Sequence, residues 1–186
     1  MISDTFVSAL ARSIPPSGIR RFFDIAATME DVISLGIGEP DFDTPAPIVE
    51  AGVAALQRGA THYTSNAGLL ELRQAIAAHL HRLYGVSYDP AREVLVTVGV
   101  SEALYLAMAA LLNPGDEIIF AEPCFVAYGP VAMMVNAKPV AISTTPETGF
   151  QLTAEMIEAA ITPRTKVLFI TSPNNPTGVV ISREHL

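Results

Sequence analysis

The stretch VLFITSPNNPTGVV, from Val167 to Val180, decides the fold class of this protein. Its first half is apolar and β-branched, which is typical of a strand buried on both faces of a parallel sheet. The strand pattern stops at the heptad SPNNPTG (172–178), where prolines fix φ and a glycine permits a left-handed turn. Such a rigid polar turn suits the presentation of a side-chain amide to a ligand, although N-P-x-G also occurs as ordinary turn chemistry.

Helix and strand patterns alternate from this stretch back to about residue 45. Apolar runs predict strands at 93–98, 117–122, 138–143 and 166–172. Helical spacing and capping residues predict helices at 45–59, 69–85, 102–112, 125–135 and 153–161. Asp43 or Thr44 is expected to cap the first of these helices and Thr153 the last. Strands separated by helices of this length predict a three-layer α/β/α domain with a mainly parallel sheet.

The first 44 residues follow a different pattern. They contain one weak helix near 18–29 and a short strand at 32–38. We therefore expect 1–44 to form an N-terminal arm and part of a smaller domain, ahead of a main domain at 45–186.

The composition disfavours several classes of protein. Half of the residues are hydrophobic and 16% are charged, which is typical of a compact fold rather than a disordered chain. The net charge of −8 disfavours nucleic-acid binding, which needs a basic face. A single cysteine, Cys124, excludes an internal disulfide, and the four histidines lack metal-ligand spacing. We expect a cytoplasmic protein with no metal, nucleic-acid or membrane partner.

Three polar turns fall where predicted parallel strands end. They are GVSEAL (99–104), EPCFVAY (122–128) and SPNNPTG (172–178). Ligands of open α/β sheets bind beyond the carboxyl ends of the strands, so the coincidence of these turns predicts a binding site there.

Each turn also has an ordinary structural explanation. A helix that starts at Ser101 or Glu102 would present the N–H groups of Val100 and Ser101 as a phosphate cradle, but Ser101 can equally be a plain helix cap. The Phe125 ring can stack on a planar ligand or pack in the core. We expect Cys124 to be a packing residue.

Two further turns contain candidate ligands. Gly38, in GEPDFDTP (38–45), offers a backbone N–H to a carboxylate or belongs to a rigid connector. Tyr63, in THYTSNAG (61–68), offers a hydroxyl to a phosphate, although most loop tyrosines only pack.

Together these motifs resemble the class I/II aminotransferases, the fold-type-I enzymes that depend on pyridoxal 5′-phosphate, and most closely their aspartate-aminotransferase-like branch. The resemblance covers about residues 33–186 and rests on five motifs in the family's order and approximate spacing: LGIGEPDFDTP, HYTSNAGLLELRQAI, VTVGVSEAL, PCFVAY and SPNNPTG. It implies that 45–186 is the N-terminal part of a large cofactor-binding domain, so that the predicted α/β/α domain is incomplete here. It also implies transfer of an amino group from an α-amino acid to a 2-oxo acid through pyridoxal 5′-phosphate.

The resemblance implies roles for residues at the strand ends. Val100 and Ser101 would hold the cofactor phosphate, and the Phe125 ring would stack on the pyridine. Asn175, the second asparagine of the heptad, would hydrogen-bond the phenolic oxygen. Many relatives have tryptophan or tyrosine where this chain has Phe125, which retains stacking without the polar group.

The resemblance also implies roles for two residues elsewhere in the chain. Gly38 would bind the substrate carboxylate through its backbone. Tyr63 would reach the cofactor phosphate of the neighbouring subunit, which implies a homodimer with shared active sites.

Three functional groups of the family follow the asparagine turn and are missing from this chain. They are the Schiff-base lysine, the acid that pairs with the pyridine nitrogen and the arginine that binds the substrate carboxylate. The chain has two lysines, Lys138 and Lys166, at the amino ends of predicted strands. We therefore expect it to be about the first half of such an enzyme and to be inactive by itself.

The same resemblance raises a question about the fold. In the family's sheet, strands of the second half lie between 93–98 and 166–172. We therefore expect 93–98 to lack its native neighbour here, and the chain alone not to form a stable native monomer.

Three alternatives remain open. One is a related pyridoxal-phosphate-dependent C–S lyase or synthase on the same scaffold. Another is a non-catalytic module that binds the cofactor for regulation, and the third is a degenerate product without activity. The sequence does not define which amino acid or 2-oxo acid is used.

Overall fold

The computed structural model describes residues 6–15, 18, 22, 25–26, 28–33, 38 and 40–185. They divide into two compact units, one formed by 98–186 with the N-terminal residues up to 17, and the other by 18–97. The helix expected near 18–29 and the strand expected at 32–38 fall largely outside the described residues.

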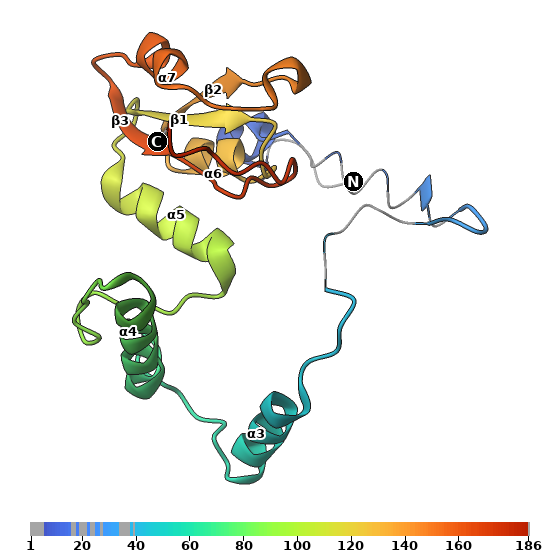
Figure 1. The fold of residues 1–186 in the computed structure, drawn as a ribbon, viewed down its shortest axis with the longest axis vertical. Helices are drawn as coiled ribbons and strands as arrows, with labels where there is room; N and C mark the ends of the chain where they lie inside the picture. The colour runs from blue at the N-terminus through green and yellow to red at the C-terminus, as the bar shows by residue number, and fades with distance from the viewer. Residues whose placement is uncertain are drawn as a thin grey trace. The chain divides into compact units, whose positions relative to one another are not determined.

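The first unit is built on a three-stranded parallel sheet with the strand order β2-β1-β3 (Figure 1). Strands β1 (Glu117–Glu122) and β2 (Lys138–Ser143) have the predicted bounds, whereas β3 spans Thr165–Phe169 and ends earlier than predicted. β1 is central, pairs with a strand on each side and is the most buried of the three, with Ile118 and Ile119 completely buried. The predicted parallel sheet is thus confirmed.

Helices cover both faces of this sheet, as predicted (Figure 1). Successive strand side chains point to opposite faces, so Ile118 and Phe120 pack on α5 (Gly99–Leu111) and α6 (Tyr128–Met134). Ile119 packs on the opposite face, against α7 (Ala154–Ala160). The layers are therefore helix, sheet and helix, with β1 at the centre of both cores.

Short capped elements complete the first unit. Thr153 caps α7 as predicted, its hydroxyl accepting from the Met156 N–H at 3.4 Å. The one-turn 3-10 helix η2 (Pro146–Thr148) leads from β2 toward α7. Near the N-terminus, α1 (Ala9–Ser13) is capped by the Ser8 hydroxyl and contacts α6.

The second unit contains α3 (Ala46–Gln57) and α4 (Leu70–Tyr84). α4 ends at Gly85 in the left-handed region, as its sequence predicts. Its apolar face is only partly covered: Leu69, Leu72 and Leu83 are about half exposed, and the buried positions are Arg73 and Ala77. The Arg73 guanidinium donates to the carbonyls of Gly68, Pro90 and Ala91 at 2.8–3.2 Å and so ties the helix to its flanking loops.

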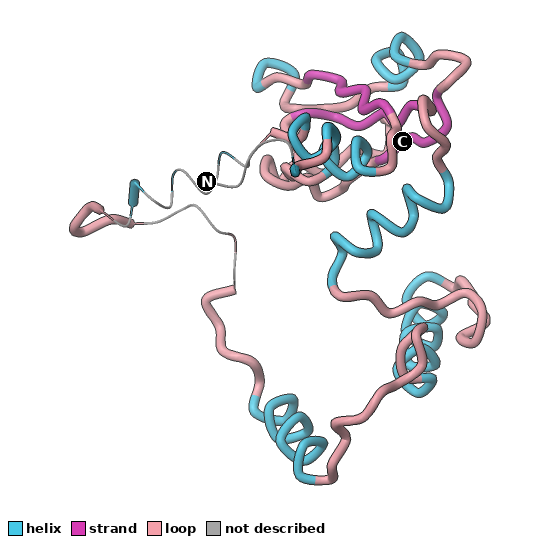
Figure 2. The backbone as a smooth tube through the Cα atoms, turned by 180° about the vertical axis from the view of Figure 1, so that it is seen from behind, coloured by secondary structure: helices cyan, strands magenta, loops and turns pink. Residues whose placement is uncertain are grey.

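The strand predicted at 93–98 does not form, and this part of the prediction is wrong. These residues are loop between α4 and α5 (Figure 2). The Val96 N–H bonds the Ala67 carbonyl, and Leu95 and Val98 are exposed. A strand needs a second strand to pair with, and the sheet formed by the described residues contains only β1, β2 and β3. The absence of a strand at 93–98 agrees with our expectation that this segment lacks its native neighbouring strand in this chain.

Two local predictions are also wrong. The N-cap of α3 is Pro45, not Asp43 or Thr44, and no side chain caps it. A proline in the first turn lacks one of the N–H groups that a cap would satisfy, which lowers the need for one. α6 begins at Tyr128, so Phe125 lies in the loop before the helix.

No helix among the described residues is long and apolar enough to cross a membrane.

Candidate functional site

The first turn of α5 supplies backbone donors. The helix begins at Gly99, earlier than the predicted start at Ser101 or Glu102, and Gly99 has a φ of +75° that favours glycine. Val100 and Ser101 therefore lie within the first turn, where amide N–H groups have no carbonyl acceptor inside the helix. The Glu102 carboxylate accepts from the Val98 N–H and holds the chain at the helix start.

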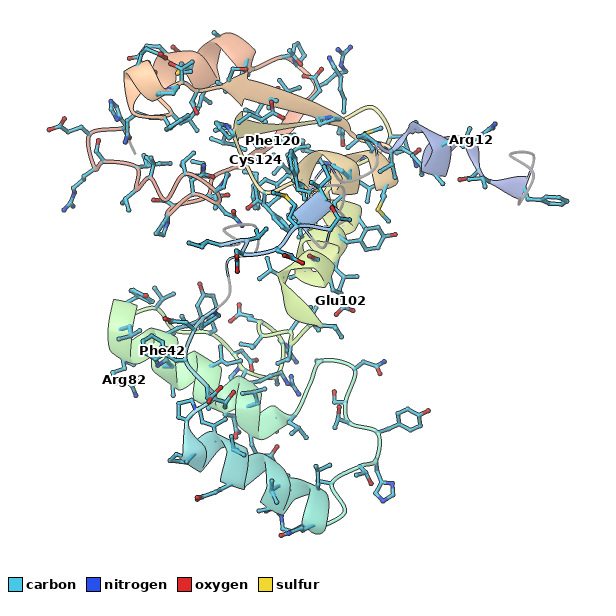
Figure 3. The ribbon with its side chains drawn as sticks, turned by 90° about the vertical axis from the view of Figure 1, so that its right-hand side faces the viewer. Arg12, Phe42, Arg82, Glu102, Phe120 and Cys124 are labelled. Atoms are coloured by element: carbon cyan, nitrogen blue, oxygen red, sulfur yellow. The ribbon has the colours of Figure 1, made fainter. Side chains whose placement is uncertain are left out.

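The loop after β1 carries the second candidate group. Phe125 is half-buried and meets the Tyr128 ring edge to face, with centroids 5.8 Å apart. Cys124, on the same loop, packs against the core that contains Phe120 (Figure 3). Burial, assisted by the charge of Glu122, raises the pKa of the Cys124 thiol to about 11, in agreement with the packing role predicted for it.

The heptad after β3 carries two asparagines with different surroundings. The Asn174 side-chain amide donates to the Pro123 carbonyl and to the Thr177 hydroxyl, both at 2.9 Å. Its neighbour Asn175 is exposed. One asparagine of the pair thus holds the turn against the loop after β1, and the other is presented to solvent.

These three loops meet around one cavity of about 350 Å³. It is lined by Gly99, Val100, Ser101, Leu104, Phe125, Tyr128 and Asn175. The structure therefore brings together four of the six residues singled out in the sequence, from positions 75 residues apart at the extremes. The arrangement places helix-start N–H groups and a hydroxyl near a flat apolar ring and an amide, which suits a planar ligand with an anionic group.

Three of the residues that line the cavity were not candidate site residues in the sequence: Gly99, Leu104 and Tyr128. Leu104 follows Val100 and Ser101 by one helical turn, and Tyr128 follows Phe125 by three residues. Tyr128 is buried and also meets the rings of Phe120 and Phe169 edge to face. The helical spacing was the available signal for Leu104, whereas the contacts of Tyr128 depend on strands that are distant in the chain.

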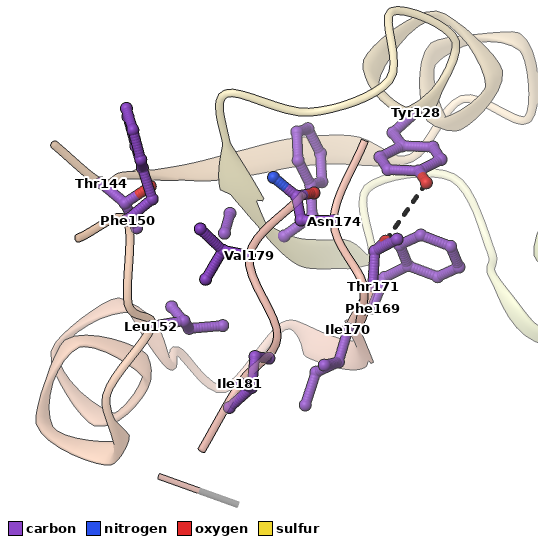
Figure 4. Close-up of a pocket in the computed structure, with 12 residues that line it drawn as sticks. Tyr128, Thr144, Phe150, Leu152, Phe169, Ile170, Thr171, Asn174, Val179 and Ile181 are labelled. Carbon is purple, nitrogen blue, oxygen red and sulfur yellow. Dashed lines mark hydrogen bonds between the residues drawn. The ribbon is translucent and has the colours of Figure 1, made fainter. Parts of the chain in front are cut away.

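A second cavity, of only about 20 Å³, lies between the sheet and the segment 170–181 (Figure 4). It has room for about one water molecule, and polar and apolar atoms line it in similar measure. Tyr128 lines both cavities, and its hydroxyl accepts a hydrogen bond from Thr171 at 3.2 Å. We interpret the small cavity as part of the packing behind the larger one.

The two remaining candidates belong to the other unit, 18–97. Gly38 is exposed, and nothing lies within 4 Å of where a Cβ would be. Tyr63 is fully exposed and, with Thr61 and His62, lines a surface concavity of about 490 Å³. The roles expected for both residues stay predictions.

Comparison with known proteins agrees with this architecture. The model of the family "Aminotransferase class I and II" matches residues 30–186. The chain is 50% identical to the protein YugH of Bacillus subtilis, over 98% of this chain and 47% of that protein. It is 46% identical to an aspartate aminotransferase of Pyrococcus abyssi, over 93% of this chain and 44% of that one.

Solved structures give the same result. The aspartate aminotransferase of Thermotoga maritima is 40% identical, with a TM-score of 0.91 over 96% of this chain and 48% of that one. The chain therefore belongs to the class I and II aminotransferase family, with the fold-type-I architecture. Members of this family are pyridoxal 5′-phosphate enzymes. The chain spans about half the length of the curated relatives it matches.

Proposed function

We propose that this chain is part of a pyridoxal 5′-phosphate-dependent aminotransferase that moves an amino group from an α-amino acid to a 2-oxo acid. The observation that carries the proposal is the cavity on which Val100, Ser101, Phe125 and Asn175 converge. Relatives named as aspartate and aromatic-amino-acid aminotransferases support the same reaction class.

The groups around the cavity fit the parts of this cofactor. The N–H groups of the first turn of α5 and the Ser101 hydroxyl suit a phosphate, because the positive end of the helix dipole lies there. The Phe125 ring suits a planar pyridine, and the exposed Asn175 amide suits the phenolic oxygen. A volume of about 350 Å³ is in the range of small-molecule sites.

When bound, the cofactor supplies the electron sink for chemistry at the substrate's α-carbon. The residues of this chain bind and orient it. Ser101 and Val100 fix the phosphate end, Phe125 fixes the plane of the ring, and Asn175 fixes its rotation within that plane. The backbone N–H of Gly38 binds the substrate carboxylate in this proposal.

The proposal extends to assembly and location. Tyr63 reaches the cofactor phosphate of a second subunit, which makes the protein a homodimer, and its full exposure leaves it accessible for that role. Residues 1–44 form an arm and part of a small domain, and 45–186 the first part of the large domain. We place the protein in the cytoplasm, in amino-acid biosynthesis.

The Schiff-base lysine is the part of the machinery that we do not assign in this chain. Lys138 bonds the Glu117 carboxylate at 3.0 Å, and Lys166 pairs with Asp116 at 3.5 Å. Both lie at the amino ends of their strands, whereas Phe125 and Asn175 follow the carboxyl ends. We propose that the catalytic lysine belongs to a second half and that these residues alone are inactive.

An intact mass, measured after incubation with pyridoxal 5′-phosphate and borohydride reduction, tests the proposal. A mass near twice 19.8 kDa with one stoichiometric adduct would support a full-length enzyme with its lysine. A mass of 19.8 kDa with no adduct, or with scattered partial labelling, would contradict catalysis by this gene product.

Substitutions at the cavity test the cofactor site directly. We expect Ser101→Ala to weaken cofactor binding about tenfold or more, because a charge-assisted hydrogen bond is lost. Phe125→Leu should weaken it as well, through lost stacking. Val126→Ala is the matched control, since Val126 is next in the chain and does not line the cavity. Equal binding by all three variants would contradict the site.

A further inference from the structure

Two segments that are distant in the chain both line the larger cavity. Phe125 belongs to the loop after β1, and Asn175 belongs to the heptad after β3. A planar ligand between them requires a fixed separation between the ring and the amide. Parallel strands bring the two segments to the same edge of the sheet but do not fix how the loops beyond that edge are spaced.

Two side-chain hydrogen bonds join these loops beyond the sheet. The Asn174 Nδ2 donates to the Pro123 carbonyl at 2.9 Å, across 51 positions of sequence. The Thr171 hydroxyl donates to the Tyr128 hydroxyl at 3.2 Å (Figure 4). The first bond is the closer one to Asn175, because Asn174 is its neighbour in the chain.

Asn174 is itself held by the turn it belongs to. Its backbone N–H donates to the Val179 carbonyl at 2.9 Å, and its carbonyl accepts from the Gly178 N–H at 2.7 Å. The same side-chain Nδ2 donates to the Thr177 hydroxyl at 2.9 Å. A half-buried side chain with this many partners has little rotamer freedom left to lose on ligand binding.

We propose that Asn174 is a positioning residue for the cofactor site. Its amide cross-links the asparagine turn to the loop after β1 and so sets the Asn175 amide at a fixed distance from the Phe125 ring. Asn174 acts through these two residues rather than by touching the ligand. This inference rests on the proposed function, because it needs a planar ligand between ring and amide.

The test uses the full gene product and two substitutions of the cross-link. Asn174→Asp is nearly isosteric but replaces the donor by an acceptor that faces the Pro123 carbonyl. Asn174→Ala removes the side chain. Thr177→Val is the matched control, because it deletes the two bonds that the Thr177 hydroxyl accepts within the turn, from Asn174 Nδ2 and from the Val179 N–H, and leaves the bond between the loops in place.

The readouts are the dissociation constant for pyridoxal 5′-phosphate and the visible circular dichroism of the bound cofactor, which reports ring orientation. We expect both Asn174 variants to bind about five- to tenfold more weakly, the effect of one well-formed hydrogen bond, with a changed visible spectrum. We expect Thr177→Val to stay within about twofold of the wild type. Melting temperatures without cofactor identify any variant that fails to fold.

A double-mutant comparison separates positioning from direct contact. If Asn174 acts through Asn175, the Asn174→Ala/Asn175→Ala double variant should bind about as well as Asn175→Ala alone. Additive losses, wild-type binding by both Asn174 variants, or an equal loss in Thr177→Val would each overturn the inference. A wild-type protein that takes up no pyridoxal 5′-phosphate would instead overturn the proposed function, and this inference with it.

Discussion

The guanidinium of Arg164 holds the carboxylate of Glu117, with Nη2 3.0 Å and Nε 3.3 Å from the same oxygen, Oε1. Lys138 donates to that oxygen at 3.0 Å, and the Thr162 hydroxyl donates to Oε2 at 2.5 Å. The Glu117 side chain is completely buried at the amino end of β1, and the positive charges of Lys138 and Arg164 balance its negative charge. This cluster joins the starts of β1 and β2 to the turn before β3.

The Glu117 cluster predicts a pH dependence of stability. The Thr162 hydrogen bond, with those of Lys138 and Arg164, lowers the pKa of Glu117 from 4.5 to about 2 despite its burial. A pKa lower in the folded state means that protonation favours unfolding. The contribution should be complete above about pH 4.5 and lost as the pH falls toward 2. Denaturant unfolding of the full gene product between pH 2.5 and 6, roughly the span of this titration, measures it.

Glu117→Gln is the control for this titration. It retains the size of the side chain and removes the charge, so the difference in unfolding free energy between wild type and variant should shrink as the pH is lowered. A difference that stays constant over the same pH range would show that Glu117 does not carry the effect.

Gly68 should not tolerate a side chain. Its φ is +92°, and a Cβ there would lie 2.7 Å from the Val96 Cβ and 2.8 Å from its Cγ2. We expect Gly68→Ala to lower the free energy of unfolding by about 1–3 kcal/mol, from backbone strain and the clash together. Gly52→Ala, inside α3 with nothing within 4 Å, should instead add about 0.5–1 kcal/mol. Chemical unfolding measures both, and equal effects would contradict the argument.

Arg73 should matter for stability although it is charged. It is buried on α4 and donates to three backbone carbonyls, of which two belong to the loop after the helix. We expect Arg73→Ala to cost about 2 kcal/mol or more, because these carbonyls lose a charged donor. Arg82→Ala is the control on the same helix, since Arg82 is exposed and bonds the exposed His79, and it should cost less than about 0.5 kcal/mol. Thermal and denaturant unfolding compare the two.

Cys124 should react slowly. Burial, followed by the charge of Glu122, raises the pKa of its thiol from 9.0 to about 11, so the thiolate fraction at neutral pH falls about 100-fold. We expect iodoacetamide to modify the native protein about 100 times more slowly than the urea-unfolded protein. Glu122→Gln should restore only part of the rate, since burial is the larger cause. Labelling at the unfolded rate would show that the thiol is solvated.

Local chemistry explains the parts of the fold that were predicted well. β1 and β2 have the predicted bounds because their apolar runs are flanked by Gly, Asp, Pro and Asn, which stop a strand. α7 begins where Thr153 caps it. The segment 93–98 has the same apolar signature and yet is loop, because a strand depends on a neighbour as well as on its own residues.

In the candidate site, too, some features follow from the local sequence and others depend on the tertiary structure. The sequence by itself determined the turn that contains Asn175 and the family to which the chain belongs, because turn chemistry and motif order are local properties of the chain. It placed the start of α5 two or three residues too late, since the helix begins at Gly99. Only the tertiary structure decided that Phe125 and Asn175 share a cavity, and that Asn174 rather than Asn175 joins the two loops. The physical reason is that parallel pairing of β1 with β3 brings together residues far apart in sequence, and side-chain hydrogen bonds then fix their spacing.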